Sequence, residues 1–435
     1  MTLSTQPIKG ARDFYPEDER LQKYIFTKWR EVCERFGYEE YDSPILEPID
    51  LFLSKGNEEI INEQTYSFED RGERKLIVRT EMTPSVSRMV AARRQELAYP
   101  LRWYSIPQCW RYERTQRGRG REFYQLNVDI FGVEDSKADL EIIQVADAVM
   151  QSFGAKRASY QIKVNSRKLV DEFLLNILRL DETQANTLRK LIDKRAKIES
   201  TEFNALLEAV FSPSQRDNGT SQQLLKFLDT DKIEFLPESL RTFTSTKELT
   251  QLISQLNKDD VTNIEFDPSL MRGFDYYTDI TFEVFDTNPE NNRSMFGGGR
   301  YDGLVAMFGV EPVPTVGFGM GDIPLQNFLE VNNLMPELRT ETDLYVIMLG
   351  DVLEPAQQVV KELRQMGVNT AVDYTGRKLD KQIKTADKKG INYVLFIGDK
   401  ELEDEQFTLK NLKTGEEEKH SLQRIVSAVK DYRKK

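Results

Sequence analysis

Histidine is almost absent from this sequence. His420, close to the C-terminus, is the only one among 435 residues. A mechanism that needs a histidine base, a catalytic triad or a histidine-ligated zinc in the main part of the chain is therefore excluded. The chemistry must rest on arginine, on carboxylates or on the substrate itself.

Cysteine and long apolar runs are also scarce. Cys33 and Cys109 are the only cysteines, and they are far apart. A disulfide framework or a zinc site is not expected, and we expect a reducing compartment. No run approaches the roughly 18 apolar residues that a membrane span needs, and the N-terminus carries no apolar signal segment. These absences predict a cytoplasmic protein without a membrane partner.

Length and charge define the broad class. A chain of 435 residues has room for two or three domains, and its 39% of apolar residues can form cores. The net charge is −12. This charge argues against broad nonspecific nucleic-acid binding, which needs a basic surface, although it leaves room for a local one.

The stretch from Trp103 to Gly132 predicts a strand, a basic loop and a second strand. One face of the second strand is polar, with Gln125, Asn127 and Asp129 at alternate positions. The loop and its edges carry Arg111, Arg114, Arg117, Arg119 and Arg121. Phosphate is the obvious ligand for such guanidinium groups. The alternative is an exposed, solvated hairpin, but burying three unpaired polar groups would cost about 1 to 3 kcal/mol each, which favours a bound ligand.

The first 166 residues mix helices and strands. Apolar spacing predicts a helix from Glu17 to Phe36 that Gly37 ends. Further expected elements are a strand at 38–48 interrupted by Pro44, a hairpin at 65–80, a helix from about Thr83, a helix at 137–153 and a strand at 160–164. Glu81 and Thr83 precede a helix, so they could meet an ammonium group or simply cap that helix.

The segment from about residue 167 to residue 257 has helical periodicity and predicts a helical insertion, with a loop at 212–221. Strand patterns return at Ile264 and at 271–285. FGGGRYDGL (296–304) could be only a glycine turn, and GFGMGD (317–322) only a tightly packed strand leading into a helix. Neither is a dinucleotide fingerprint, because the G-x-G-x-x-G spacing is missing.

From about Asp343 the pattern becomes βαβα and predicts a separate small α/β domain. Within it, GRKLDKQIKTADKKG (376–390) holds six basic and two acidic residues. This segment is either a solvated helix face or a patch that contacts a polyanion.

Several motifs together resemble those of the histidyl-tRNA synthetases, which are class II aminoacyl-tRNA synthetases, over essentially the whole chain. YDSPILEP (41–48) resembles motif 1 at the dimer interface, and WRYERTQRGRGREFYQLNVDIFG (110–132) resembles motif 2. RGFDYYT (272–278) and GGGRYDGL (297–304) resemble the two histidine signatures, and 376–390 resembles part of the anticodon-binding domain.

The resemblance implies an α+β class II fold: an antiparallel catalytic sheet with flanking helices, a helical insertion near the acceptor end of the tRNA, and a C-terminal α/β anticodon-binding domain. The expected divisions are 1–166 and 261–335 for the two parts of the catalytic domain, 167–260 for the insertion and 341–435 for the anticodon-binding domain. It also implies a homodimer and, as ligands, histidine, ATP with Mg²⁺, and histidine tRNA.

Residue roles follow by motif match. The resemblance implies catalytic roles for Arg111 and Arg272 and no resident metal ion, because Arg272 occupies a position where related enzymes use one. It implies ATP contacts by Arg111, Glu113, Arg119 and Phe123. It implies histidine contacts by Glu81, Met82, Thr83, Arg111, Gln125, Asp129, Arg272, Tyr276, Tyr277 and Tyr301.

The implied mechanism suits a chain without histidine. The substrate carboxylate attacks the α-phosphorus of ATP without needing a base, while Arg111 and Arg272 stabilise charge. For the transfer to tRNA, we expect a phosphate oxygen of the adenylate to accept the proton.

Two departures from the family pattern stand out. The motif 3 region has Asp322, Ile323 and Pro324 where many class II enzymes carry an arginine for the γ-phosphate, which leaves Arg114, Arg119 or Mg²⁺ for that task. Asp279 stands where the family often has glycine.

The competing hypothesis is a non-catalytic paralogue, such as the regulatory subunit of ATP phosphoribosyltransferase. That class usually lacks the C-terminal domain and the catalytic arginines, both of which this chain has. Synthetases for threonine, proline or glycine share the fold but not RGFDYY with GGGRYDG.

Overall fold

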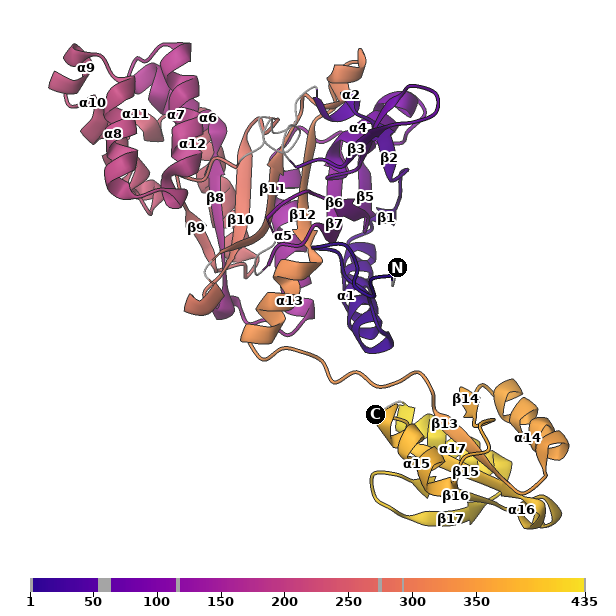
Figure 1. The fold of residues 1–435 in the computed structure, drawn as a ribbon. Coiled ribbons are helices and arrows are strands. Elements are labelled where there is room, and N and C mark those ends of the chain that lie inside the picture. The colour runs from indigo at the N-terminus through magenta and orange to yellow at the C-terminus, as the bar shows by residue number, and fades with distance from the viewer. Residues whose placement is uncertain (1–2, 54–63, 115–117, 273–275, 292, 434–435) are drawn as a thin grey trace. The chain divides into compact units, whose positions relative to one another are not determined.

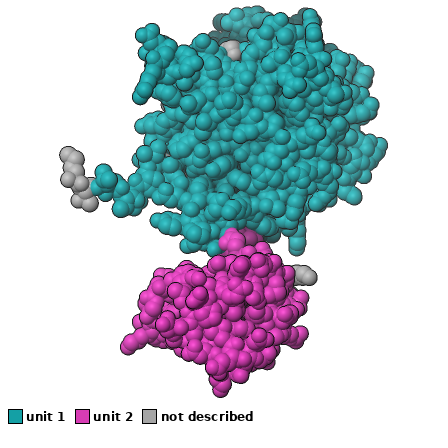
Figure 2. Space-filling view, turned by 90° about the vertical axis from the view of Figure 1, so that its right-hand side faces the viewer, with its two compact units in different colours: residues 1–335 teal, residues 336–435 magenta. Residues whose placement is uncertain are grey.

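The computed structural model describes residues 3–53, 64–114, 118–272, 276–291 and 293–433. The chain forms two compact units, residues 1–335 and residues 336–435 (Figure 2). Within the described residues, no helix has the length and apolar character needed to cross a lipid bilayer.

A large sheet organises the first unit (Figure 1). Among the described residues it has nine strands, in the order β1-β5-β7-β12-β11-β10-β8-β9, with β6 paired to the start of β7. The bounds are β1 Glu39–Glu40, β5 Leu101–Ser105, β6 Gln108–Trp110, β7 Glu122–Phe131, β8 Tyr160–Ser166, β9 Ile264–Phe266, β10 Ile280–Asp286, β11 Ser294–Arg300 and β12 Thr315–Gly321. Only the outer pairs, β1 with β5 and β8 with β9, are parallel. The prediction of a large, mainly antiparallel sheet is confirmed.

The two faces of β7 have opposite character, as the alternation predicts. Leu126, Val128 and Ile130 are buried in the main core, where α5 (Lys137–Ser152) packs against β7 and β12. The helix α1 (Pro16–Arg35) packs on α5. It begins with proline and three acidic residues, which suit a helix N-terminus, and Gly37 follows it at φ +80°. The polar side chains of β7 are left to the opposite face.

The segment 38–48 corrects one expectation. Instead of one strand it forms β1 in the large sheet and β2 (Leu46–Pro48) in a separate sheet, which has three strands in the described part of the chain, in the order β2-β4-β3. Pro44 lies between β1 and β2, where no hydrogen bond of either sheet requires the backbone N–H that proline lacks. The other strands are β3 (Ser67–Glu69) and β4 (Lys75–Val78), which form the predicted hairpin, and α2 (Asp50–Leu53) lies beside β2.

The glycine-rich segments are both strands. Gly297, Gly298 and Gly299 lie inside β11, so the alternative of a glycine turn is wrong. Gly317 and Gly319 lie in β12, which leads directly into α13 (Asp322–Val331), as predicted for GFGMGD.

Helices fill the sequence between β8 and β9. They are α6 (Arg167–Asp171), a π-helical turn η2 (Glu172–Ile177), α7 (Glu182–Lys194), α8 (Ser200–Val210), α9 (Pro213–Asp217), α10 (Thr220–Leu228), α11 (Glu238–Arg241) and α12 (Thr244–Lys258). The predicted loop at 212–221 is wrong, because α9 forms there with a capping box between Ser212 and Gln215. Their apolar residues join the core of the large sheet.

The second unit has a five-stranded sheet of order β14-β13-β15-β16-β17. The predicted βαβα pattern is confirmed by β13 (Leu344–Leu349), α14 (Leu353–Gln365), β14 (Thr370–Val372), α15 (Leu379–Lys388) and β15 (Tyr393–Gly398). Unpredicted are α16 (Asp399–Asp404), β16 (Phe407–Asn411), β17 (Glu417–His420) and α17 (Leu422–Arg433). The six basic residues of 376–390 are all exposed.

Candidate active site

A polar pocket opens on the face of the large sheet that does not meet α5. It encloses about 380 Å³ of empty space, counting its open mouth. Its lining comprises Glu81, Thr83, Arg111, Gln125, Asn127, Asp129, Arg272, Tyr276, Tyr277, Gly297, Tyr301, Gly317, Phe318 and Gly319. Residues from six separate stretches of sequence therefore converge here.

The floor of the pocket is made of glycine backbone. A Cβ on Gly317 would collide with the Asp129 carboxylate, and one on Gly319 would lie 2.8 Å from Gln125 Nε2. On β11, a Cβ on Gly297 would lie 2.7 Å from Arg272 Nη1. The missing side chains thus leave the space that three charged or polar groups of the site occupy.

Asp129 forms one end of the pocket. Its carboxylate is 4% exposed and accepts a hydrogen bond from the Tyr301 hydroxyl. Burial raises the pKa of Asp129 to about 7, although the hydroxyls of Tyr301 and Tyr41 lower it. Such a carboxylate is suited to accept a ring N–H from a bound ligand.

Glu81 approaches the pocket from the N-terminal end of α4 (Thr83–Arg93). The Tyr276 hydroxyl donates to Glu81 Oε2 at 3.2 Å. Burial raises the pKa of Glu81, while the charge of Arg111 and hydrogen bonds from Tyr276 and Thr83 lower it. The N-cap of α4 is Met82, and it makes no side-chain cap hydrogen bond, so the capping alternative for Glu81 and Thr83 is not observed. Both residues line the pocket.

Three tyrosines wall the space between the two acids. The ring centroids of Tyr276 and Tyr277 are 4.9 Å apart, and Tyr301 lies 5.6 Å and 6.4 Å from them. All three are buried. Each ring is therefore fixed by the other two.

Arg111 lies at the other end of the pocket. Its Nε donates to the carbonyl of Thr80 at 3.0 Å, and its guanidinium lies 5.2 Å from the centre of the Phe123 ring. Beyond it, Arg119 pairs with Glu113 at 3.3 Å. Glu113, Arg119 and Phe123 are not part of the pocket lining but extend the site from Arg111 outward.

Arg272 is held from two sides. Its Nη1 donates to Glu283 Oε1 at 2.6 Å and its Nη2 to the carbonyl of Gly297 at 3.2 Å, while its buried Nε has no partner among the described residues. Burial lowers the pKa of Arg272, but Tyr277 and Glu283 raise it more, so the guanidinium stays charged. Its φ of +55° is a strained conformation of the kind that concentrates at functional sites.

The structure does not bring every predicted residue into the pocket. The side chain of Met82 is fully buried away from the lining and accepts a hydrogen bond from the Ser43 hydroxyl. Arg114 is exposed. Arg117 and residues 273–275 of RGFDYYT lie outside the described residues.

Some lining residues had no role assigned from the sequence. Asn127 lines the pocket and donates from Nδ2 to the carbonyl of Gln125 at 3.1 Å. The alternation along β7 placed it on this face. The alternate spacing of Gly317 and Gly319 was the sequence feature that could have predicted a glycine floor. The side chains that occupy the space above it, Asp129 and Gln125, belong to a strand that is distant in sequence.

Asp322, which stands in the motif 3 region where many class II enzymes carry an arginine, joins several elements of the fold. Its carboxylate accepts from Arg12 Nη2 at 2.9 Å, from Gln22 Nε2 at 3.1 Å and from the backbone N–H of Tyr124 at 3.0 Å. It therefore ties α13 to α1, to β7 and to the segment before α1. It does not line the pocket.

Comparisons with known proteins give the family of this chain. The family model described as Histidyl-tRNA synthetase matches residues 10–321, and the model described as Anticodon binding domain matches residues 343–432. The histidine–tRNA ligase of Leptospira biflexa is 40% identical over 435 residues, covering 99% of this chain and 98% of that protein.

Two solved structures share the fold. The histidyl-tRNA synthetase of Nostoc sp. PCC 7120 has a TM-score of 0.82 at 24% identity, covering 99% of this chain and all of that one. The apo histidyl-tRNA synthetase of S. aureus has a TM-score of 0.73 at 27% identity, covering 98% of this chain and all of that one. Since the family model spans most of the sequence and the Leptospira protein aligns almost end to end, this chain belongs to the histidyl-tRNA synthetase family.

Proposed function

We propose that the protein is a histidine–tRNA ligase, which activates histidine with ATP and then transfers it to the 3′ end of its tRNA. The observation that carries the proposal is the arrangement of one pocket. A buried acid paired with a tyrosine stands at one end, and two anchored arginines stand at the other. Family membership supports the same conclusion.

The pocket suits histidine in both of its polar parts. Asp129 would accept the imidazole N–H, with Tyr276, Tyr277 and Tyr301 around the ring. Glu81, Thr83 and Gln125 would bind the α-ammonium. A ligand without the ring N–H would leave Asp129 with only its tyrosine partner and without the second donor that its buried carboxylate can accept, which explains how the site would reject it.

The activation step needs placement and charge stabilisation. The histidine carboxylate oxygen forms a bond to the α-phosphorus while the bond from that phosphorus to the bridging oxygen breaks, and pyrophosphate leaves with the electron pair. Arg111 and Arg272 would bind the α-phosphate oxygens, and the Nε of Arg272, which has no partner among the described residues, is a donor for such an acceptor. Phe123, stacked near Arg111, would face the adenine, and Glu113 with Arg119 would border the phosphates.

Mg²⁺ would enter with the nucleotide. Among the described residues, no three histidine, cysteine or acidic side chains gather as a metal site. The ion would be held mainly by phosphate and water, as Mg²⁺ at nucleotide sites often is, and Glu113 is the carboxylate of the predicted ATP set. When bound, the ion would neutralise phosphate charge.

Further partners follow from family membership. We infer that the second unit binds the anticodon of histidine tRNA, with the exposed basic residues of 376–390 as candidates. We also infer a cytoplasmic homodimer. Ile45 and Leu46, in the motif 1 segment, are about 40% exposed, which would suit a dimer interface.

The first experiment is ATP–pyrophosphate exchange against each of the twenty amino acids. We expect exchange with histidine alone, and its loss in Arg272→Ala. Arg93→Ala, which removes a surface arginine paired with Glu96, is the control and should keep full activity. Tight histidine binding without any exchange would instead indicate a regulatory paralogue.

A further inference from the structure

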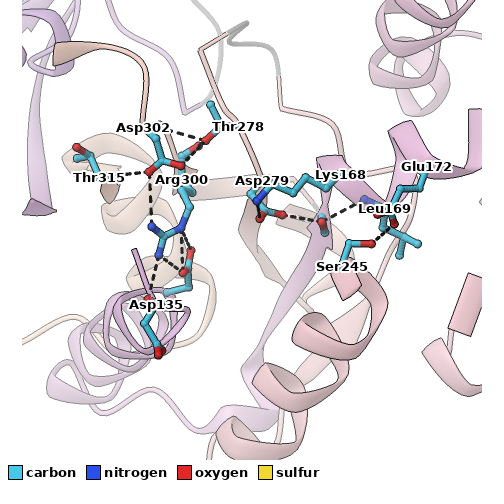
Figure 3. Close-up of polar contacts among 12 residues, drawn as sticks. Asp135, Lys168, Leu169, Glu172, Ser245, Thr278, Asp279, Arg300, Asp302 and Thr315 are labelled. Atoms are coloured by element: carbon cyan, nitrogen blue, oxygen red, sulfur yellow. Dashed lines mark hydrogen bonds and ion pairs between the residues drawn. The ribbon is translucent and has the colours of Figure 1, made fainter. Parts of the chain in front are cut away.

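Two pocket tyrosines are followed directly by two anchoring residues. Tyr276 and Tyr277 line the pocket, and Thr278 and Asp279 then lead into β10. Thr278 binds the β11 side: its N–H donates to the carbonyl of Arg300 at 2.7 Å and its hydroxyl to Asp302 at 3.1 Å. Asp279 faces the other way, toward the helical insertion (Figure 3).

Asp279 binds the place where the insertion begins. Its carboxylate accepts from the Ser166 hydroxyl at 2.7 Å and pairs with Lys168 Nζ at 2.6 Å. Its backbone carbonyl also accepts from the N–H of Arg167 at 3.1 Å. Asp279 is 6% exposed and Ser166 is fully buried, so water competes little for the hydrogen bond between them, whereas the Lys168 side chain is 56% exposed.

The same Ser166 hydroxyl caps the first helix of the insertion. Ser166 is the N-cap of α6, and its oxygen accepts from the backbone N–H of Leu169 at 3.2 Å. One hydroxyl therefore joins the helix start to Asp279. From α6 the connection continues through η2, where Glu172 accepts a hydrogen bond from Ser245 of α12.

A buried carboxylate is not required to cap a helix, since Ser166 already does so. Burying a charge is costly unless it is paired, and Ser166 and Lys168 provide the partners of Asp279. Because Asp279 follows two pocket tyrosines directly, this paired contact lies next to the pocket wall in sequence. The rings of Tyr276 and Tyr277 are packed against each other and against Tyr301. A shift of the backbone at Asp279 would thus be transmitted to the walls of the pocket.

We propose that Asp279 is a positioning residue that joins the N-terminus of α6 to the tyrosine pair, so that amino-acid occupancy of the pocket and the order of the insertion's first helix are coupled. The proposal rests on the proposed function, because it takes histidine as the occupant. Coupling of this kind is reciprocal: what orders α6 also improves the pocket.

Steady-state exchange kinetics test the pocket side of this coupling. Asp279→Ala should raise the KM for histidine about tenfold, as expected for loss of hydrogen bonds to a buried charged group, while kcat and the KM for ATP change less than about twofold. Asp279→Asn, which can still accept from Ser166, and Lys168→Met, which keeps the carboxylate, should each show a smaller rise. These two variants test the proposal even where Asp279→Ala does not fold.

The matched control is Asp267→Asn. Asp267 follows β9, where the insertion returns to the sheet, and pairs with Lys163 of β8 at 3.0 Å. It joins the end of β9, just after the insertion, to β8 with an ion pair of similar length, and it does not touch the tyrosine segment. Equal increases in KM for the control and for Asp279→Asn would show that the contact only stabilises the fold, and would overturn the proposal.

Amide hydrogen exchange tests the insertion side. Saturating histidine should slow exchange at residues 167–177 of the full-length protein, and this protection should be lost in Asp279→Ala but retained in Asp267→Asn. Absence of protection in the unsubstituted protein would overturn the coupling. Failure of the proposed function would look different, because the unsubstituted protein would then show no ATP–pyrophosphate exchange with histidine.

Discussion

At the scale of single residues, Asp129 carries the conflict between stability and recognition. It is buried among tyrosines and strand backbone, and its burial raises its pKa to about 7 from an ordinary value of 3.8. Its charged form is what an imidazole N–H needs as an acceptor. The folded chain therefore holds a group that is most useful in the state that the fold disfavours.

This conflict predicts a pH dependence of histidine use. The kcat/KM for histidine should fall as pH decreases through about 7, because Asp129 then becomes protonated and its carboxylate loses acceptor strength. The profile is measured by pyrophosphate exchange between pH 5.5 and 9. In Asp129→Asn, activity should be low throughout, and the acidic limb should be reduced to the titration of histidine itself. If the fall of kcat/KM at acidic pH were unchanged in that variant, a group other than Asp129 would be responsible for it.

A second prediction concerns stability. Between pH 4 and 7 the folded protein binds more protons at Asp129 than the unfolded chain, so its stability falls as pH rises through this window. Asp129→Asn lacks that loss and should raise the free energy of unfolding at pH 8 by about 1 to 3 kcal/mol, an advantage that vanishes near pH 4. Thermal unfolding at both pH values checks this, and a variant that is less stable at pH 8 would contradict it.

The position of a single residue could be predicted from the sequence where the pattern that places it lies within one strand or helix. Alternation along one strand was enough to place Gln125, Asn127 and Asp129 on one face. The anchor of Asp129 was not visible in this way, because Tyr301 is 172 positions away and reaches it only through strand pairing. The roles of Gly317 and Gly319 could not be predicted for the same reason, because the side chains that need their space, Asp129 and Gln125, lie on a paired strand that is distant in sequence.

At the scale of elements, a carboxylate stands at the start of α13, in the motif 3 region where many class II enzymes carry an arginine. Asp322 stands in the motif 3 region, yet it binds Arg12, Gln22 and the backbone of Tyr124 instead of a phosphate. It thereby sets how α13 meets α1 and β7. Burial raises the pKa of Asp322, while Arg12 lowers it.

Substitution separates these two roles of Asp322. Asp322→Ala should lower the free energy of unfolding by about 2 kcal/mol, a value reduced because Arg12 is partly exposed and keeps Glu122 as a partner. The KM for ATP should stay within about twofold, since no phosphate contact is lost. Chemical denaturation and exchange kinetics measure both quantities. A large rise in the KM for ATP with unchanged stability would return Asp322 to the nucleotide site.

Elements with strong periodicity were predictable, and those whose form depends on a distant partner were not. The helix α1 follows from its apolar spacing. The division of 38–48 into β1 and β2 does not, because β1 pairs with β5 and β2 with β4, and only these partners separate the strands. Likewise, Gly297–Gly299 read locally as a turn, and only β10 and β12 on either side hold them extended.

At the scale of the whole molecule, the division after Met335 predicts separable activities. A fragment of residues 1–335 should retain histidine-dependent pyrophosphate exchange within about threefold, because every pocket residue lies in it. Its kcat/KM for charging histidine tRNA should fall about a hundredfold, because anticodon contacts worth roughly 3 kcal/mol would be lost. Parallel exchange and charging assays decide this, and a fragment that charges tRNA normally would contradict the role inferred for the second unit.

The glycine floor has a consequence for anyone who wishes to redesign this pocket. A floor of bare backbone cannot be enlarged, because glycine has nothing left to remove, and it cannot be narrowed at Gly317 without striking Asp129. New amino-acid specificities must therefore be built from the tyrosine walls and from β7. Libraries for an unnatural imidazole analogue should diversify these positions and leave Gly297, Gly317 and Gly319 unchanged.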